Sequence, residues 1–515
     1  MKNSTFDTFK KENRLILFGH EDAGKEDDSR LTSYYYKTIQ YEDVMSGLNL
    51  QIITGEKGTG KSALLKMAYI ESSEKNFVPL WIRLDDLSEL YSDILRSDNL
   101  YELKTLWKRA ISKLVIMKLI SHMTFVMGDD CQKAMTWAYN TGYAEKDFIA
   151  KSVKILKPMY DKYIELDEDY ESCGEHHMLQ RMINDKKIRL FFDDFDLDWK
   201  GKASDILKIK SLLLVLSDMT SDMGGLSARI ALRTDVYEMI RDEEFSDKFE
   251  SSIIKCQWNN QEIMKTLAKR ICTYFNETFD ESITANKQTM QYNIAKYLNI
   301  VFVPRFDEHA RAWTNAPTHK VIYSLIRRKP RDMVKLCQSV AEEAYKKRLN
   351  LIDSSCFFSI LETYSRERLK DLVNEYNNQM PKLREVLIKM APTQKEFQNK
   401  RKERYVYTTA ELHNKIKNIQ QNIQIGIYQA NSEKMCTADF HQVAHFLYKI
   451  GFITGRKRNE TRKIERVYYD EDKYLLLANV GDRGYSWEIH PAYRGALANG
   501  TNDNWELTFD VDDEG

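Results

Sequence analysis

The stretch "NLQIITGEKGTGKSALLKMAY", Asn49–Tyr69, contains the pattern G-x-x-x-x-G-K-[ST] over Gly55–Ser62. The apolar run before this pattern predicts a short buried strand, and the residues after it predict a helix opened by the glycine-rich loop. Glycines let successive backbone N–H groups turn toward one anion, and the helix start adds the positive end of its dipole. The stretch therefore predicts a phosphate-binding loop at the end of a strand in an α/β domain.

The side chains of the loop have distinct expected tasks. Lys61 supplies a positive charge for the β- and γ-phosphates of a nucleotide, and the Ser62 hydroxyl is a ligand for Mg²⁺. No guanine-reading N-K-x-D segment follows the fourth predicted strand, which favours ATP over GTP. We therefore expect ATP and Mg²⁺ as cofactors, held by the residues Gly55, Lys57, Gly58, Thr59, Gly60, Lys61, Ser62 and Ala63.

A nucleotide site also needs a carboxylate for the metal, and "IRLFFDDFDLDW" places two acids at the end of an apolar strand. Asp193 is the expected metal ligand, and Asp194 beside it is expected to orient the attacking water. A calcium loop built from Asp194, Asp196 and Asp198 is the alternative, but that loop needs Gly where Trp199 stands. Asp196 and Asp198 are interpreted either as solvated acids or as residues that hold the following turn.

The overall composition does not indicate a binding partner, so any preference must come from local charge. The chain of 515 residues has 77 Lys and Arg and 77 Asp and Glu, so it has no net preference for nucleic acid or membrane. Its seven cysteines include no C-x-x-C pair, which is typical of free thiols in a reducing compartment and predicts a cytoplasmic protein. The tightest set of candidate metal ligands is Cys173, His176 and His177, which is better explained as a solvated loop than as a zinc site.

Further strands are expected in "FVPLWIRL", "KKIRLFFDDFD", "SARIALRTD" and, less clearly, "SIIKCQW". Strands that alternate with helices predict a parallel sheet covered on both faces. The expected organisation is an N-terminal lead-in, a P-loop core with a helical insertion, a helical lid, a winged-helix-like domain and an acidic tail. The corresponding ranges are 1–47, 48–259 (with the insertion at 99–186), 260–375, 376–500 and 501–515.

The insertion leaves room for one more strand between the loop strand and the acidic strand, and "SARIALRTD" is the candidate. This resembles the additional-strand class of P-loop ATPases, whose central strand ends in a polar sensor of the γ-phosphate. Arg233 stands at that end, and "ALRTD" is similar to the strand-Arg motif of the signal-transducing (STAND-type) ATPases. The alternative for Arg233 is a salt bridge with Asp235.

The segment "IRRKPRDMVKLC" resembles the lid-helix motif of the same ATPases, in which an arginine reaches back to the phosphates. Pro330 is expected to start this helix, so that Arg331 lies in its first turn. Arginine there opposes the helix dipole, and a nearby anion would account for it. Arg328 is the second candidate, and an ordinary surface arginine is the alternative.

Six segments together resemble a bacterial family of stand-alone, AAA-like P-loop ATPases found in phage-defence gene neighbourhoods: "FGHEDAGKEDD", "YEDVMSG", "GEKGTGKSA", "FFDDFD", "ALRTDVY" and "RRKPRDM". The resemblance covers about residues 17–345. It implies an ATPase active in antiviral defence that forms homo-oligomers, with Arg241 as a candidate for completing a neighbour's site. Many relatives carry Glu after the metal-binding Asp, so the shorter Asp194 implies slow, switch-like turnover.

The C-terminal third divides by charge. Residues 381–470 hold 18 Lys and Arg against 9 Asp and Glu, whereas residues 471–515 hold 3 against 10. A helix that Asp439 or Thr437 caps, then a turn and strands, resembles the recognition helix and wing of a winged helix-turn-helix. His441 and His445 share a helix face but lack the Glu of a zinc-protease motif. The side chains expected to neutralise DNA phosphates are those of Arg456, Lys457, Arg458, Arg462, Lys463 and Arg466.

The fold class expected is therefore α/β, a P-loop NTPase parallel sheet with a helical insertion, a helical lid and a C-terminal winged-helix domain. The leading hypothesis is a slowly hydrolysing ATPase switch that passes its nucleotide state to double-stranded DNA or a partner effector. The alternative is an ATP-clamped DNA-binding protein of chromosome or mobile-element maintenance. A small-molecule kinase is disfavoured, because the insertion and the long C-terminal extension do not suggest a compact acceptor pocket.

Overall fold

The computed structural model describes the chain in segments: 4–75, 77–121, 176, 179–180, 183, 187–196, 199, 201–241, 247–282, 290–399, 403–428, 435–458, 464–477 and 482–498. Two compact units are present. Unit 1 comprises Met1–Tyr36, Lys57–Gly60 and Gln257–Gly515, and unit 2 comprises Lys37–Glu56 and Lys61–Cys256. The five domain ranges expected from the sequence stay predictions.

Unit 2 contains a five-stranded parallel sheet with the order β2-β3-β4-β1-β5. Its strands are β1 (Leu50–Gly55), β2 (Phe77–Ile82), β3 (Lys187–Phe192), β4 (Leu226–Arg233) and β5 (Ile253–Lys255). All six residues of β1 are buried, as expected for a parallel strand covered on both faces. The strand β4 lies between β1 and β3, which confirms the additional strand expected from "SARIALRTD".

The strand register aligns the carboxyl ends of the three central strands. Gly55 of β1 lies opposite Arg233 of β4, and Phe192 of β3 lies opposite Ile230 of β4. Asp193 follows β3 directly, so the glycine loop, the acidic doublet and Arg233 all emerge at one edge of the sheet. This edge is where open parallel sheets bind ligands.

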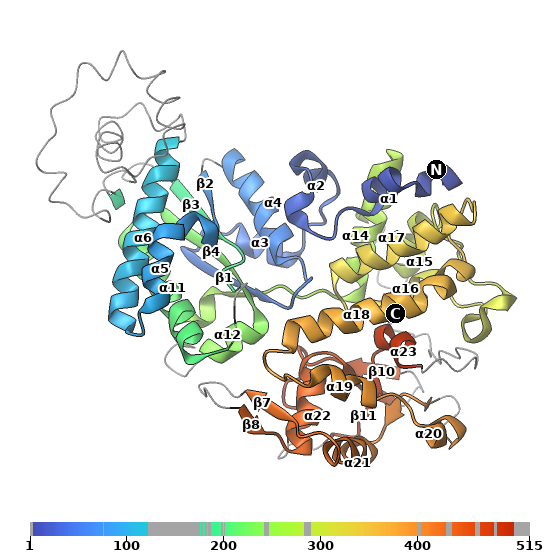
Figure 1. Ribbon diagram of the computed structural model, residues 1–515. Helices are drawn as coiled ribbons and strands as arrows, with labels where there is room; N and C mark the ends of the chain where they lie inside the picture. The colour runs from blue at the N-terminus through green and yellow to red at the C-terminus, as the bar shows by residue number, and fades with distance from the viewer. Residues whose placement is uncertain are drawn as a thin grey trace, which may run out of the picture. The chain divides into compact units, whose positions relative to one another are not determined.

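Helices cover both faces of this sheet, as Figure 1 shows. On one side lie α3 (Ile39–Val44) and α4 (Lys61–Glu74); on the other lie α6 (Leu100–Ser121) and α11 (Ala203–Asp222). The remaining elements of the unit are η3 (Leu84–Leu87), α5 (Ser88–Arg96), α12 (Thr234–Ile240) and η5 (Glu250–Ser252). The helix α6 opens the predicted helical insertion, most of which lies outside the described residues.

Two arginines are buried within the sheet itself. Arg229 of β4 is fully buried and donates hydrogen bonds to the backbone oxygens of Val44, Ser46 and Leu48 at 2.8–2.9 Å. Arg189 of β3 reaches the same Ser46 oxygen at 3.4 Å. Because buried cations need acceptors, these bonds fix the link between α3 and β1 and so the start of the loop strand.

Unit 1 begins with helices at the N-terminus and continues in an all-helical segment after Gln257. The N-terminal elements are η1 (Phe6–Phe9), α1 (Lys11–Phe18), η2 (Ala23–Lys25) and α2 (Asp28–Tyr34). The later helices are α14 (Asn260–Phe275), α15 (Met290–Leu298), η7 (Glu308–Trp313), α16 (Thr318–Leu325), α17 (Pro330–Lys346) and α18 (Ser354–Tyr376). Asn259 caps α14 in a capping box with Glu262, and Pro330 starts α17 as expected.

The C-terminal domain follows α18 and has its own core. Its helices are α19 (Leu383–Lys389), α20 (Gln394–Asn399), α21 (Thr409–Gln420), α22 (Phe440–Lys449) and α23 (Pro491–Leu497). Its four-stranded sheet has the order β10-β9-β11-β6, formed by β6 (Val406–Tyr407), β9 (Ile453–Arg458), β10 (Ile464–Val467) and β11 (Ser486–Ile489). A small hairpin of β7 (Gly426–Tyr428) and β8 (Met435–Thr437) precedes α22.

The helix–turn–hairpin order of a winged helix is present in this domain. The Asp439 carboxylate accepts from the backbone N–H of Gln442 at 2.9 Å, which confirms Asp439 as the cap of α22. Gly451 provides the turn with φ +68°, and β9 and β10 then form an antiparallel pair. After this pair, Tyr474–Leu476 form turns, and Leu475 and Leu476 are buried.

The long helix α18 joins the two cores of unit 1. Phe357 and Leu361 near its start lie in the core of the helical segment, whereas Leu372 and Tyr376 near its end lie in the core of the C-terminal domain. The described helices include none that is both long enough and apolar enough to cross a membrane.

Candidate nucleotide site and C-terminal basic surface

The glycine loop has the backbone conformation that its sequence predicts. Gly58 and Gly60 have φ +87° and +92°, in the left-handed region that favours glycine. The helix α4 begins at Lys61 immediately after them, so its first free N–H groups face the loop. Thr59 is buried, and Ala63 is half-buried in the first turn of α4. This arrangement can bind an anion.

Lys61 is held at the base of the loop. Its ammonium donates to the backbone oxygens of Gly55 at 2.8 Å and Glu56 at 3.1 Å. A half-buried lysine that is bonded to neutral carbonyl oxygens has no compensating charge from them. A phosphate oxygen would be a stronger partner, because hydrogen bonds between charged groups are about twice as strong.

The predicted metal ligands are close to one another within unit 2. Asp193 is 7% exposed, and the Ser62 hydroxyl lies close enough to its carboxylate to stabilise the ionised form. Burial raises the pKa of Asp193 to about 6, the charge of Asp194 adds to this, and Ser62 and Lys61 oppose it. One hydroxyl and one carboxylate fit Mg²⁺, which keeps several waters and takes its other oxygens from substrate phosphates. The described residues contain no group of three His, Cys, Asp or Glu arranged for a metal ion.

The second acid of the doublet has a different environment. Asp194 is exposed and has φ +64°, a left-handed conformation that is uncommon for residues other than glycine, although Asp tolerates it. Such conformations cluster at functional sites. Its expected role in holding a water stays a prediction.

Of the two interpretations of Asp196, the solvated acid is wrong, and the residue that holds a turn agrees with the structure. It is 9% exposed, and its Oδ2 accepts from the backbone N–H of Arg233 at 2.6 Å. Burial raises the pKa of this carboxyl group, while the charge of Lys61 opposes the shift. Asp196 therefore ties the turn after β3 to the end of β4. The alternation of acids in "DDFDLD" was the available signal, but it does not distinguish a buried carboxylate from a solvated one.

Arg233 lies at the predicted strand end and makes the salt bridge that was its alternative interpretation. Its Nε and Nη2 donate to the two carboxylate oxygens of Asp235 at 3.0 and 2.6 Å. A bidentate pair of this kind holds the guanidinium in place. A role in sensing phosphate would require Arg233 to exchange this partner for the γ-phosphate.

Arg331 and Arg328 belong to unit 1 and differ in what they contact. Arg331 lies in the first turn of α17, where its backbone N–H donates to the Gly58 oxygen at 3.3 Å and its Nε to the Glu21 oxygen at 3.2 Å. Arg328 instead pairs with Glu471 of the C-terminal domain at 2.5 Å. Of these two candidates, Arg331 is therefore the one in contact with the glycine loop.

The basic residues in the described part of the C-terminal hairpin do not form one surface. Arg456 and Arg466 are each 9% exposed and contact the buried Glu488 at 3.7 and 2.9 Å, and Arg456 also pairs with Glu403 at 3.2 Å. The expected DNA contact of Arg456 is therefore wrong: its side chain is buried in ion pairs within the domain. Lys457 is exposed, and Arg458 is exposed and pairs with Glu403 at 3.3 Å. Arg462 and Lys463 lie outside the described residues, as do Cys173 and His177 of the histidine-rich stretch.

Taken together, the strand order, the glycine loop and the acid after β3 define the fold of a P-loop nucleoside triphosphatase with an additional central strand, followed by a winged-helix domain. No protein-family model matches the sequence, and no curated protein matches it.

Solved structures with some likeness to the chain come from archaea. The Aeropyrum pernix ORC1 protein in complex with DNA is 10% identical, with a TM-score of 0.34 over 95% of this chain and 96% of that one. The Aeropyrum pernix ORC2 protein in its ADPNP–ADP complexes is 10% identical, with a TM-score of 0.37 over 91% and 96%. Cdc6p from Pyrobaculum aerophilum is 11% identical, with a TM-score of 0.30 over 94% and 96%. Likeness at this level supports no inference about activity.

Proposed function

We propose that this chain is an ATP-dependent switch that binds Mg·ATP at the glycine loop, hydrolyses it slowly and signals its nucleotide state through the C-terminal domain. The observation that carries the proposal is the proximity of Ser62, at the start of α4, to the buried Asp193, which directly follows β3. These are the two positions from which a P-loop site supplies oxygen ligands to a metal. Lys61 carries the adjacent positive charge.

In this proposal each side chain has a separate task. Lys61 leaves its carbonyl partners and binds β- and γ-phosphate oxygens. The metal, when bound, neutralises charge that develops on the phosphates. Asp194 holds the attacking water, and Arg233 moves from Asp235 to the γ-phosphate. The side chain of Asp194 is one methylene shorter than glutamate, so it holds that water less closely and turnover is slow.

The direct test measures ATP binding and phosphate release by the full chain, by Lys61→Ala and by the control Lys75→Ala. Lys75 is an exposed residue just after α4, so its loss changes charge but not the loop. We expect Lys61→Ala to lower the turnover rate roughly 100-fold, as the loss of one charge-stabilising donor commonly does. Equal rates in all three proteins would refute the proposal.

The target of the switch is proposed to be double-stranded DNA. Lys457 and Arg458 are exposed on β9, and residues 381–470 carry twice as many Lys and Arg as Asp and Glu. The alternative function is an ATP-clamped DNA-binding protein of chromosome or mobile-element maintenance. It would use the same surface, but binding duplex DNA would be its main activity. Anisotropy titrations of a fluorescent duplex with and without ATP distinguish the two. The clamp holds DNA as long as ATP is bound, whereas the switch releases DNA when ATP is hydrolysed.

Two parts of the proposal have their own tests. The role in phage defence and the possible partner effector rest on the sequence resemblance alone, and neighbouring genes that encode a toxic effector would support them. Homo-oligomer formation with Arg241 acting on a neighbour's site predicts that ATP increases the sedimentation coefficient. It also predicts that Arg241→Ala lowers turnover without lowering ATP affinity.

A further inference from the structure

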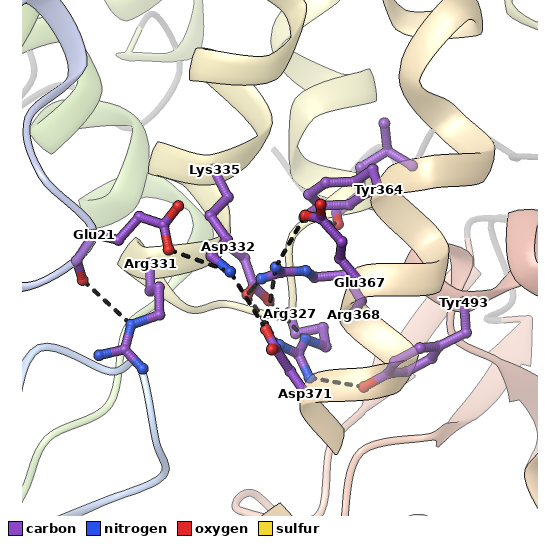
Figure 2. Close-up of polar contacts among 11 residues, drawn as sticks. Glu21, Arg327, Arg331, Asp332, Lys335, Tyr364, Glu367, Arg368, Asp371 and Tyr493 are labelled. Carbon is purple, nitrogen blue, oxygen red and sulfur yellow. Dashed lines mark hydrogen bonds and ion pairs between the residues drawn. The ribbon is translucent and has the colours of Figure 1, made fainter. Parts of the chain in front are cut away.

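The first turn of α17 directs consecutive side chains toward two different parts of unit 1 (Figure 2). Arg331 contacts the glycine loop and Glu21, as described above. A Cβ atom placed on Gly58 would lie 3.2 Å from the Cβ of Arg331, so the loop tip and the helix are in close contact. A conformational change of the loop at Gly58 would therefore move the start of α17 through direct steric contact.

The next residue, Asp332, is the centre of a buried ion cluster. It is 1% exposed and accepts from Arg327 Nε and Nη2 at 2.6 and 2.9 Å and from Arg368 Nη1 at 2.7 Å. Burial alone would raise the pKa of Asp332, but the two guanidinium groups outweigh it and hold the pKa well below its ordinary value. Because removing any one partner leaves a buried charge, the cluster tolerates little change in geometry.

The same cluster extends into the C-terminal domain. Arg327 Nη1 donates to the hydroxyl of Tyr493 in α23 at 2.9 Å, and Tyr493 is fully buried. The next residue, Arg328, pairs with Glu471 and stacks over the ring of Tyr468, whose centroid lies 4.0 Å from the guanidinium carbon. Both bridges start within four residues of Arg331.

We infer that the first turn of α17 couples the nucleotide state of the glycine loop to α23 of the C-terminal domain. The path runs from Gly58 through Arg331 and Asp332 to Arg327 and Tyr493. This inference rests on the proposed function and states how the same site is read out. A packed ion cluster has a few discrete arrangements instead of a continuous range, which is what transmission of a small shift requires.

The test compares the unchanged protein with Tyr493→Phe and the control Tyr364→Phe. Tyr364 is also buried beside the cluster, but its hydroxyl donates to the Leu325 backbone oxygen at 3.0 Å and does not reach the C-terminal domain. Hydrogen–deuterium exchange of the α23 amides is measured with and without ATP, together with ATP affinity. We expect ATP to change α23 exchange by about fivefold or more in the unchanged protein and the control.

In Tyr493→Phe we expect the ATP effect on α23 to fall below about twofold while ATP affinity stays within about twofold. An equal α23 response in all three proteins would overturn the inference, as would ATP binding without any α23 response. A failure of the unchanged protein to bind ATP would instead refute the proposed function and the inference with it. If Tyr493→Phe does not fold, Glu471→Gln removes the charge from the second bridge and is expected to lower the same response.

Discussion

Replacing Asp193 with asparagine is expected to stabilise the core of unit 2 while abolishing ATP hydrolysis. Asp193 is 7% exposed, and the pKa of its carboxyl group is raised to about 6 from an ordinary 3.8. The folded state therefore binds this proton more tightly than the unfolded state does. The cost of keeping the group ionised is complete above pH 6 and absent below pH 3.8. A shift of this size corresponds to about 3 kcal/mol of unfolding free energy at neutral pH.

Asparagine is isosteric, and its amide oxygen can still accept from the Ser62 hydroxyl. The gain in unfolding free energy for Asp193→Asn should thus be about 3 kcal/mol near pH 7.5 and about half of that near pH 5. Exchange of the slowest amides in β1 and β3, measured without nucleotide and with a chelator present, reports this quantity for unit 2 alone. Asp194→Asn is the matched control, and its exposed side chain predicts a smaller gain. A loss of stability, or a gain that does not depend on pH, would refute the reasoning.

Three further predictions concern the other charged groups. Glu488→Gln should destabilise the C-terminal domain by roughly 3–5 kcal/mol, because buried guanidinium groups lose their counter-ion, and amide exchange in β11 and α23 should become faster. Burial alone would raise the pKa of Glu488, but Arg466 and Arg494 outweigh it and lower the pKa from 4.5 to about 2. The contribution of Glu488 to the unfolding free energy is therefore complete above pH 4.5 and is lost as the pH falls toward 2. Charge reversal of Lys457 and Arg458 together should weaken duplex binding and reduce the salt slope of log K by about 2, whereas an unchanged slope would remove this surface from DNA contact. Asp194→Glu should raise turnover about tenfold at unchanged KM, equivalent to about 1.4 kcal/mol of barrier, and a slower enzyme would contradict the water-holding role.

The glycine loop was predictable because its signals are local. A strand, a glycine pattern and a helix follow one another within Asn49–Tyr69, and each requires only its own backbone conformation. The additional strand followed from the number of apolar runs and from the space that the insertion leaves. The start of α17 at Pro330 and the cap of α22 at Asp439 were predictable for the same reason, since caps act within one turn.

The partners of charged side chains were not predictable, because tertiary contacts decide them. Arg456 and Arg466 read as exposed members of a basic hairpin, but alternate residues of a strand face opposite sides, and these two face Glu488 from β11. Lys457, the next residue of β9, pairs with Glu465 of β10 and faces solvent. The burial of Asp196 likewise depends on the end of β4, which is 37 residues away from it in the chain.

Four buried carboxylates among the described residues fall into two kinds, and the direction of their pKa shifts separates them. Asp332 and Glu488 have more than one guanidinium partner, and their pKa values are lowered. The charges of such groups are fully paired within the protein, so these groups stabilise the fold or couple its parts and do not need a ligand. Asp193 and Asp196 lie at the end of the sheet beside the loop, and burial raises their pKa values because Lys61 and the nearby donors do not compensate it. An ionised acid that is buried without full compensation lowers stability unless a cation is bound. This excess negative charge next to an anion-binding loop is the arrangement that a metal bound to a phosphate would neutralise.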